Sequence, residues 1–292
     1  MRVVCIGECM VELAPAGQGL LRQGIAGDTF NTSWYLKRLR PGWAVDYLSA
    51  VGTDAISGEM LGFMAAAGIG TGHVQRRADR TVGLYLISLK DGERSFSYWR
   101  GQSAAKTLAD DGDVLEAGLK GADLAVFSGI TLAILPPEGR MQLLAALRGF
   151  GGVVAFDPNM RTRLWPGADE MRVAVMAAAG VADVVLPSLD EETSVFGDHG
   201  AEAVIARYRA AGAGTVVVKN GAGRVTGWDR VERLVHCDPA PVVPVDTTAA
   251  GDSFNAGFLA ARLSGAMLGA ALAAGAELAG RVVQHPGALV GL

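Results

Sequence analysis

The sequence predicts an α/β fold in which helices cover both faces of a central, mostly parallel sheet. Short and almost continuously apolar segments alternate with segments of helical length along most of the 292 residues. Strands that are apolar on both faces are typical of parallel sheets buried between helical layers. The chain is long enough for one large domain or two small ones. Because no long linker divides it, we expect a single domain over residues 1–292.

Six segments are the candidate strands of this sheet, and turn-forming residues follow each of them. They are residues 3–6, 45–50, 124–127, 153–156, 184–186 and 215–218. Most of them lead into a segment of helical length, and a helix is also predicted over residues 29–39. Ligands of parallel sheets bind beyond the carboxyl ends of the strands, so we expect the site there.

Two regions interrupt the alternation and predict a smaller second sheet. Residues 11–25 are short and rich in glycine, and residues 81–100 alternate around an Asp91-Gly92 turn. Alternation on both sides of Asp-Gly is typical of a β-hairpin. We expect these lid segments, 11–25 and 81–100, to form a small β-sheet lid inserted in the domain. A further hairpin is predicted over residues 224–237.

Composition argues against several classes of protein. With 26 Lys and Arg against 30 Asp and Glu, the chain lacks the excess of basic residues of a nucleic-acid binder. Cys5, Cys9 and Cys237 are too few for a disulfide framework, and we expect buried thiols. The longest apolar stretch, residues 266–279, contains Glu277 and predicts a buried helix. We therefore expect a cytoplasmic protein with no nucleic-acid or membrane partner.

The strongest chemical signal is the segment DTTAAGDSFNAG at residues 246–257, which leads into a predicted helix. Small side chains at Ala249, Ala250 and Gly251 allow their N–H groups to approach an anion, and a helix start adds unpaired donors. Asp252 at the same point is suited to removing a proton. It could instead cap the helix. The preceding Ala-Ala-Gly and the second acid, Asp246, favour the catalytic interpretation.

With this segment the chain resembles the ribokinase-like family of sugar kinases. The family signature D-T-x-[GA]-[AG]-G-D-x-F-x-x-G matches residues 246–257 throughout. Residues 27–32 resemble the N-terminal G-G-x-x-x-N signature, with Ala26 in place of its first glycine. GECMVEL at 7–13, YWR at 98–100, DPNMR at 157–161 and QHPGA at 284–288 resemble its 2-keto-3-deoxygluconate kinases. The resemblance covers nearly the whole chain and implies a ribokinase-like fold.

The resemblance also implies the reaction, ATP-dependent phosphorylation of 2-keto-3-deoxygluconate to its 6-phosphate. Asp252 would be the general base for the attacking hydroxyl. The N–H groups of Ala249, Ala250 and Gly251 would stabilise charge on the transferred phosphoryl group. No G-x-x-x-x-G-K-[ST] motif offers another phosphate site.

For the nucleotide, the family's K-x-G loop corresponds to Lys219, Gly221 and Gly223, which follow a predicted strand. An ordinary strand-to-hairpin turn is the alternative there. Ser188 and Glu191 stand where the family has N-x-x-E, with serine replacing asparagine. The resemblance implies that Glu191 organises Mg²⁺ through water and that Ser188 contacts the nucleotide. A capping box is the alternative for these two residues.

For the substrate, a carboxylate requires charge-assisted donors, and guanidinium groups provide them in pairs. The family motifs assign that role to Arg100 and Arg161. Tyr98 would contact the substrate through its hydroxyl, while Gly27 and Asn31 would hold sugar hydroxyls, Gly27 through its backbone. Surface arginines and a packed lid aromatic are the alternatives.

Other functions remain open at this point. A fructokinase or another sugar kinase would leave Arg100 and Arg161 without a carboxylate. A catalytically silent sugar-acid sensor would not need the base Asp252. A nicotinamide dehydrogenase is disfavoured because no G-x-G-x-x-G follows residues 3–6. The resemblance further implies a homo-oligomer formed through the lid, and leaves open a monovalent cation near Asp246 and Thr248.

Overall fold

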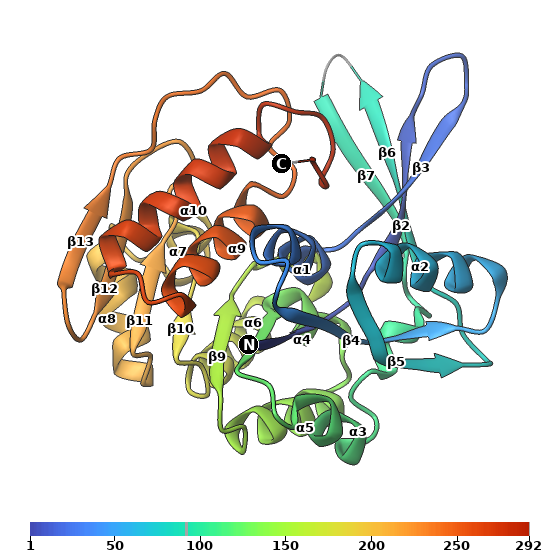
Figure 1. The fold of residues 1–292 in the computed structure, drawn as a ribbon, viewed down its shortest axis with the longest axis horizontal. Helices are drawn as coiled ribbons and strands as arrows, with labels where there is room; N and C mark the ends of the chain where they lie inside the picture. Colours follow the sequence, from blue (N-terminus) through green and yellow to red (C-terminus); the bar gives the residue numbers. More distant parts are fainter. Residues whose placement is uncertain (91–92, 292) are drawn as a thin grey trace.

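The main sheet of the computed structural model, which describes residues 1–90 and 93–291, has nine strands. Their order is β13-β12-β11-β10-β9-β8-β1-β4-β5 (Figure 1). All pairs from β5 to β11 are parallel, and the β12–β13 hairpin adds two antiparallel strands at one edge. The strands are β1 (Arg2–Ile6), β4 (Ala44–Gly52), β5 (Ile69–Arg77), β8 (Leu124–Ser128), β9 (Val153–Asp157), β10 (Val184–Val185), β11 (Thr215–Val218), β12 (Val225–Asp229) and β13 (Arg233–Cys237).

Helices cover both faces of this sheet, as predicted. In β1, Val4 and Ile6 join one buried cluster while Val3 and Cys5 join the other, because successive side chains of a strand point to opposite faces. The first cluster includes side chains of α3 (Gly112–Leu119), α4 (Gly129–Ile134), α5 (Pro137–Arg148), α6 (Ala168–Ala179), α7 (Leu189–Phe196) and α8 (Ala201–Ala211). The second includes those of α1 (Asp28–Leu39), α2 (Ala55–Ala66), α9 (Ala250–Leu263) and α10 (Leu268–Val282).

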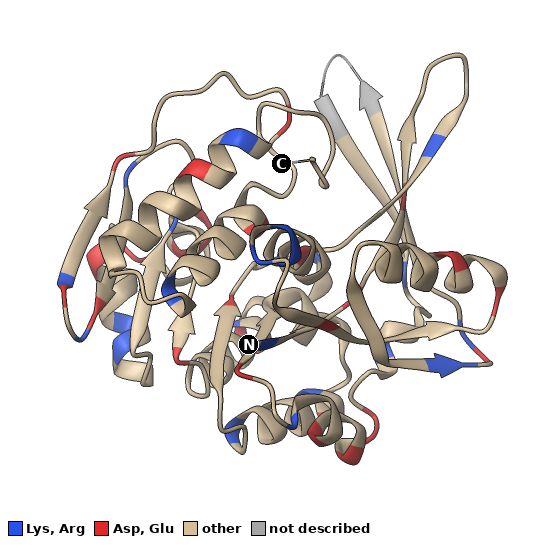
Figure 2. Ribbon diagram, viewed as in Figure 1, with Lys and Arg blue, Asp and Glu red and all other residues tan. Residues whose placement is uncertain are grey.

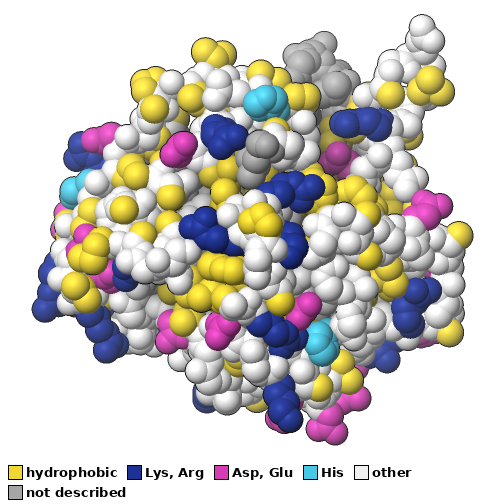
Figure 3. All heavy atoms as spheres, viewed as in Figure 1, with side chains coloured by type: hydrophobic (Ala, Val, Ile, Leu, Met, Phe, Trp, Pro, Cys, Tyr) yellow, Lys and Arg dark blue, Asp and Glu magenta, His cyan; other side chains and the backbone are white. Residues whose placement is uncertain are grey.

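A separate four-stranded sheet, called the lid sheet below, projects beside the body. Its order is β3-β2-β6-β7, with β2 and β6 parallel and the other pairs antiparallel. The strands are β2 (Met10–Pro15), β3 (Leu21–Ala26), β6 (Gly83–Lys90) and β7 (Glu93–Trp99). The predicted Asp91-Gly92 turn lies outside the described residues. Figure 3 shows the tip of the β2–β3 hairpin standing clear of the surface.

Three local features differ wholly or in part from the predictions. β5 is a strand although its side chains are mixed in polarity, because it is the edge strand next to β4 and is only partly buried. The 224–237 hairpin forms, but it extends the main sheet. Cys5 and Cys9 are buried, and burial raises the pKa of both thiols; Cys237, on the other edge strand, is partly exposed. Among the described residues no helix has the length and apolarity needed to cross a membrane.

Candidate active site

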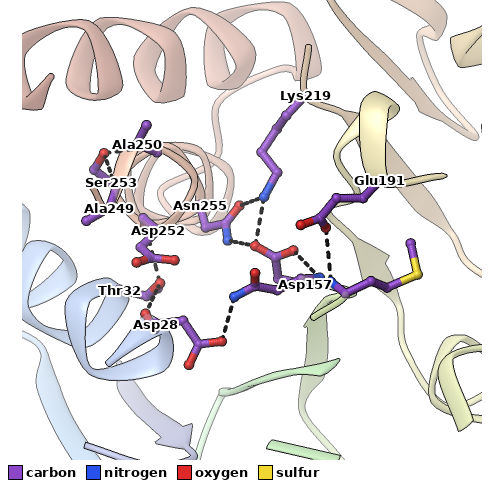
Figure 4. A network of polar contacts seen from close by, with 12 residues as sticks. Asp28, Thr32, Asp157, Glu191, Lys219, Ala249, Ala250, Asp252, Ser253 and Asn255 are labelled. Carbon is purple, nitrogen blue, oxygen red and sulfur yellow. Dashed lines mark hydrogen bonds and ion pairs between the residues drawn. The ribbon is translucent and has the colours of Figure 1, made fainter. Parts of the chain in front are cut away.

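The predicted base lies where segments distant in the sequence meet (Figure 4). Asp252 is in the first turn of α9, and its Oδ2 accepts a hydrogen bond of 2.8 Å from Nδ2 of Asn31 in α1. The helix begins after Ala249, an N-cap residue with a left-handed φ of 60°. Asp252 is therefore not the N-cap, and the capping alternative is wrong. Its carboxylate contacts α1, which is the segment predicted to hold the sugar.

The surroundings of Asp252 favour its protonated form. Desolvation raises its pKa most, and the negative charges of Asp28 and Asp157 raise it further. The Asn31 amide and the Lys219 ammonium act in the opposite direction. The net effect of burial and these four neighbours is a pKa of about 8 for Asp252. A carboxylate with a pKa near neutral is a stronger proton acceptor than an ordinary aspartate, which suits it for general-base chemistry.

A buried ion pair lies behind the base, and sequence reasoning missed it. Nζ of Lys219 lies 2.7 Å from Oδ2 of Asp157 and 3.2 Å from Oδ1 of Asn255. Nδ2 of Asn255 donates to the same Asp157 oxygen at 2.6 Å. All three residues are buried. Asp157 ends β9, Lys219 directly follows β11, and Asn255 is in α9. Lys219 was predicted to contact the nucleotide, but its ammonium is already paired inside the protein.

Lys219 nevertheless lies close to the predicted phosphate site. A Cβ built on Gly251 would be 3.5 Å from Nζ of Lys219, so the ammonium reaches the first turn of α9. It therefore adds positive charge to the helix start from the side of the sheet (Figure 4).

The network extends from Asp157 to α1. The N–H of Asn159 donates to Oδ1 of Asp157 at 3.1 Å, and its Nδ2 donates to Oδ2 of Asp28 at 2.8 Å. Asn159 has a positive φ of 32°. The signal for these residues was present in the sequence, since Asp157-Pro158-Asn159 ends a predicted strand at its carboxyl end.

The start of α9 has the small residues expected of an anion site. Ala249, Ala250 and Gly251 are all partly exposed. The first N–H groups of a helix have no acceptor within the helix. That of Ala250 donates instead to the carbonyl of Thr247 at 3.2 Å, so it is engaged in the turn. The other N–H groups of the first turn are those best placed for an anion.

Asp246 fixes the turn that precedes the helix. Its Oδ1 accepts hydrogen bonds from the N–H and the hydroxyl of Thr248, at 3.0 and 2.7 Å. Its Oδ2 accepts one from the N–H of Gly287 at 2.7 Å, which attaches the turn to the C-terminal segment. The second acid of the motif thus holds the backbone before the predicted anion site in place.

Arg161 and Glu191, predicted for two different ligands, form an ion pair with each other. The second oxygen of Glu191 accepts a hydrogen bond of 3.0 Å from the N–H of Met160. Burial raises the pKa of Glu191, and the positive charge of Arg161 opposes that change. Ser188 is the N-cap of α7, but its side chain makes no capping hydrogen bond. The capping-box alternative is therefore wrong, and Glu191 lies beside a substrate candidate.

The remaining substrate candidates lie where the lid sheet meets the body. Arg100, which follows β7, pairs with Glu8, which lies between β1 and β2. The Tyr98 hydroxyl accepts a hydrogen bond of 2.9 Å from Nη2 of Arg163. Gly27 directly precedes α1, where a Cβ would collide with the carbonyl of Glu8.

The loop after β11 forms a tight turn at the edge predicted for the nucleotide. Gly221 has a φ of +52°, a left-handed conformation that glycine adopts without strain. The N–H of Gly223 donates to the carbonyl of Asn220 at 2.7 Å. The turn connects β11 to β12. The backbone is therefore a strand-to-hairpin turn, and the same turn is the predicted nucleotide loop.

Comparison with known proteins identifies relatives for the entire chain. The model of the pfkB family of carbohydrate kinases matches residues 1–292. The 2-dehydro-3-deoxygluconokinase of Escherichia coli K12 is 40% identical over 301 residues, covering 99% of this chain and 97% of that protein. A Klebsiella pneumoniae fructokinase is 30% identical over 262 residues, covering 89% and 83%. A putative ribokinase II of E. coli, solved with ATP and Mg²⁺, shares the fold with a TM-score of 0.86 at 24% identity, covering 99% and 94%.

Proposed function

The chain belongs to the pfkB family of carbohydrate kinases, and we propose that it uses ATP to phosphorylate 2-keto-3-deoxygluconate on its 6-hydroxyl. The observation that carries the proposal is the placement of Asp252. Its carboxylate, with a pKa raised to about 8, lies at the start of a helix that can hold a phosphoryl group and contacts α1, the predicted sugar-binding segment.

The reaction follows from that placement. Asp252 accepts the proton of the substrate hydroxyl as its oxygen forms a bond to the γ-phosphorus of ATP. The bond from that phosphorus to the bridging oxygen breaks, and ADP leaves. The N–H groups at Ala249, Ala250 and Gly251 and the ammonium of Lys219 stabilise the negative charge of the transferred group. Of the three N–H groups, that of Ala250 must first exchange its bond to Thr247.

Magnesium fits the side chains beside this helix start. Mg²⁺ usually takes one or two protein carboxylates together with substrate phosphates and several waters. Glu191, at the edge of the site, offers a carboxylate that is partly exposed and could act through water. When bound, the ion neutralises charge on the phosphates.

The substrate carboxylate accounts for the arginines. Arg161 is 44% exposed in its side chain, so its guanidinium can reach a ligand while it remains beside Glu191. Arg100 at the base of the lid sheet is the second donor. In this proposal Tyr98 provides a hydroxyl, and the backbone of Gly27 and the amide of Asn31 hold sugar hydroxyls. Before the sugar binds, the Gly27 N–H donates to Oδ1 of Asn31, whose Nδ2 donates to Asp252. A neutral sugar would offer the two arginines no ligand carboxylate in addition to Glu8 and Glu191. The lower identity to the fructokinase, 30% against 40%, also disfavours that alternative.

The nucleotide and assembly are further parts of the proposal. The adenine and phosphates would lie along the turn of Gly221 and Gly223 and beside Ser188, at the carboxyl edge of β10 and β11. A monovalent cation at the turn of Asp246 and Thr248 stays a prediction, as does a homo-oligomer formed through the lid sheet.

The decisive measurement is ADP release with ATP and Mg²⁺, comparing 2-keto-3-deoxygluconate with fructose and ribose. We expect selective turnover of the keto acid. Turnover of a neutral sugar alone would keep Asp252 as the base and remove the roles of Arg100 and Arg161. ATP binding without turnover of any acceptor would support the silent sensor instead.

A further inference from the structure

All four connections between the body and the lid sheet meet at Glu8. Glu8 itself joins β1 to β2, and Gly27 joins β3 to α1. Gly83 begins β6, and Arg100 follows β7. A Cβ on Gly27 would collide with the Glu8 carbonyl, and one on Gly83 would lie 2.7 Å from Oε1 of Glu8. The backbone at Gly27 and at Gly83 is thus fitted closely against Glu8, and the connection after β7 reaches Glu8 through the side chain of Arg100.

The centre of this junction is a buried ion pair. The Glu8 carboxylate binds Nη2 of Arg100, and the two side chains are 0% and 11% exposed. A Cβ on Gly83 would also approach Cβ of Arg100 to 3.2 Å, so glycine leaves room for the pair. Removing one member of a buried ion pair leaves the other charge uncompensated, so the two side chains depend on each other.

The pair leaves hydrogen-bonding capacity unused. Oε1 of Glu8 and Nε of Arg100 are buried and have no hydrogen-bond partner among the described residues, and the hydroxyl of Ser103 is in the same state. Ser103 lies in the same junction, because its N–H donates to the carbonyl of Arg100 at 3.1 Å. Buried polar atoms without partners are rare in folded proteins. A guanidinium has five N–H donors, so binding Glu8 leaves others for a ligand.

We propose that Glu8 is a positioning residue for substrate binding: its ion pair fixes the Arg100 guanidinium at the junction of lid and body, so that the remaining donors are directed at the ligand carboxylate. This inference rests on the proposed function, in which Arg100 binds the keto acid. Holding a long side chain in place before the ligand arrives removes part of the ordering cost of binding. Glu8 thereby acts through Arg100 and does not touch the substrate.

The test is Glu8→Gln in the full chain, with kcat and both KM values measured. We expect the KM for the keto acid to rise about tenfold or more, while the KM for ATP and kcat change by less than about threefold. In an Arg100→Met background, adding Glu8→Gln should change the KM for the keto acid by less than about twofold, because residues that act through one contact are not additive.

Two further variants separate positioning from folding. Gly83→Ala retains both charges but pushes a methyl group toward the pair, and should also raise the KM for the keto acid. Asp229→Asn breaks another acid–arginine pair, in which Asp229 lies 2.8 Å from Arg262. This pair involves β12, next to the edge strand β13 of the main sheet. It should lower the melting temperature and leave that KM unchanged. If Glu8→Gln does not fold, Gly83→Ala decides.

Several outcomes would overturn the inference. An unchanged KM for the keto acid in Glu8→Gln would show that Arg100 needs no positioning, and a lower KM would show that Glu8 competes with the substrate. Additive effects in the double variant would show that Glu8 acts independently of Arg100. If the wild type does not use the keto acid at all, the proposed function fails together with this inference, whereas a failure confined to Glu8→Gln concerns this inference alone.

Discussion

At the residue scale, opposing charges surround the carboxyl group of Asp252, the proposed base. Asp28 and Asp157 disfavour ionisation of Asp252, while Lys219 and Asn31 favour it. Burial raises the pKa most, and with these neighbours the pKa is about 8, so the proposed base is half ionised near pH 8 in the free protein. Its proton affinity is therefore matched to a hydroxyl that becomes acidic only as the phosphoryl group is transferred.

Replacing the base should abolish turnover without abolishing binding. We expect Asp252→Asn to reduce kcat by at least about a hundredfold, since general-base catalysis contributes roughly 10²–10⁴-fold. The amide retains the size of the carboxylate, so calorimetry should detect keto-acid binding of similar affinity. Turnover close to that of the wild type would contradict the assignment of Asp252 as the base.

The pH profile should show the charges around Asp252. We expect kcat/KM for the keto acid to rise with pH, with its midpoint near 8, because the free enzyme must lose this proton. Lys219→Met should move the midpoint to higher pH, and Asp28→Asn should move it to lower pH, because these charges act in opposite directions. A profile that neither variant shifts would assign the titration to another group.

The same pKa has a consequence for folding stability. Its folded value, about 8, is above the ordinary value of 3.8, so between these pH values the folded protein keeps a proton that the unfolded chain has lost. Stability from this group is complete below about pH 4 and is lost as pH rises toward 8. Asp252→Asn should therefore stabilise the protein at pH 8 more than at pH 5, by urea unfolding. The exposed Asp110→Asn is the matched control, and an equal change at both pH values would contradict the prediction.

Arg161 should act on the keto acid more than on ATP. We expect Arg161→Ala to weaken keto-acid binding by at least about tenfold, the loss of one charge-assisted contact. Binding of ATP with Mg²⁺ should change less, although Glu191 loses its partner. Calorimetric titration with each ligand distinguishes the two, and equal losses would indicate a structural role.

At the scale of elements, the site depends on how closely α4 approaches the segment after β9. A Cβ on Gly129, the first residue of α4, would overlap the carbonyl of Pro158. Pro158 stands between Asp157 and Asn159, both of which belong to the network around the base. The backbone contact at Gly129 therefore fixes the positions of Asp157 and Asn159 relative to α4.

Gly129→Ala tests that contact. The added methyl group must displace backbone, so we expect a loss of about 1–3 kcal/mol in the free energy of unfolding, as for other overpacked sites, and a lower kcat. Gly58→Ala is the matched control, since this exposed glycine in α2 has nothing near its Cβ position. It should stabilise the protein by about 0.5–1 kcal/mol. Thermal unfolding and turnover of both variants decide, and a neutral Gly129→Ala would contradict the argument.

At the scale of the molecule, the lid sheet is attached to the body through a few connections and carries exposed apolar side chains. They are Leu20, Leu21, Phe96 and Trp99. We expect this sheet to open more easily than the main core. We also expect it to close over a bound substrate and to exclude water that would otherwise hydrolyse ATP.

Hydrogen exchange should report that closure. We expect amides of residues 10–26 and 83–90 to exchange faster than those of β1 and β8 in the free protein, and to slow when the keto acid and a non-hydrolysable ATP analogue are added. Exchange as slow as in the core, unchanged by the ligands, would contradict a moving lid.

The sequence by itself predicted most of the elements and the candidate base. Alternating apolar strands and helices indicate the main sheet, and two interruptions of that alternation indicate the lid sheet. Both signals are local, because the number of buried faces of an element sets the spacing of its apolar residues along the sequence. The order of small residues before Asp252 likewise predicts an anion site, and the helix that it predicts does start there, since helix geometry is local. These features depend on residues close in sequence.

Only the tertiary structure decided which charges meet. Lys219 pairs with Asp157 across 62 residues, and Glu8 pairs with Arg100 across 92. Sequence patterns indicate the face on which a side chain lies, but the partner of a charge depends on how strands and helices distant in the chain are packed. For that reason the sequence predicted Lys219 and Arg100 as site residues, while the structure alone placed each of them in a buried ion pair.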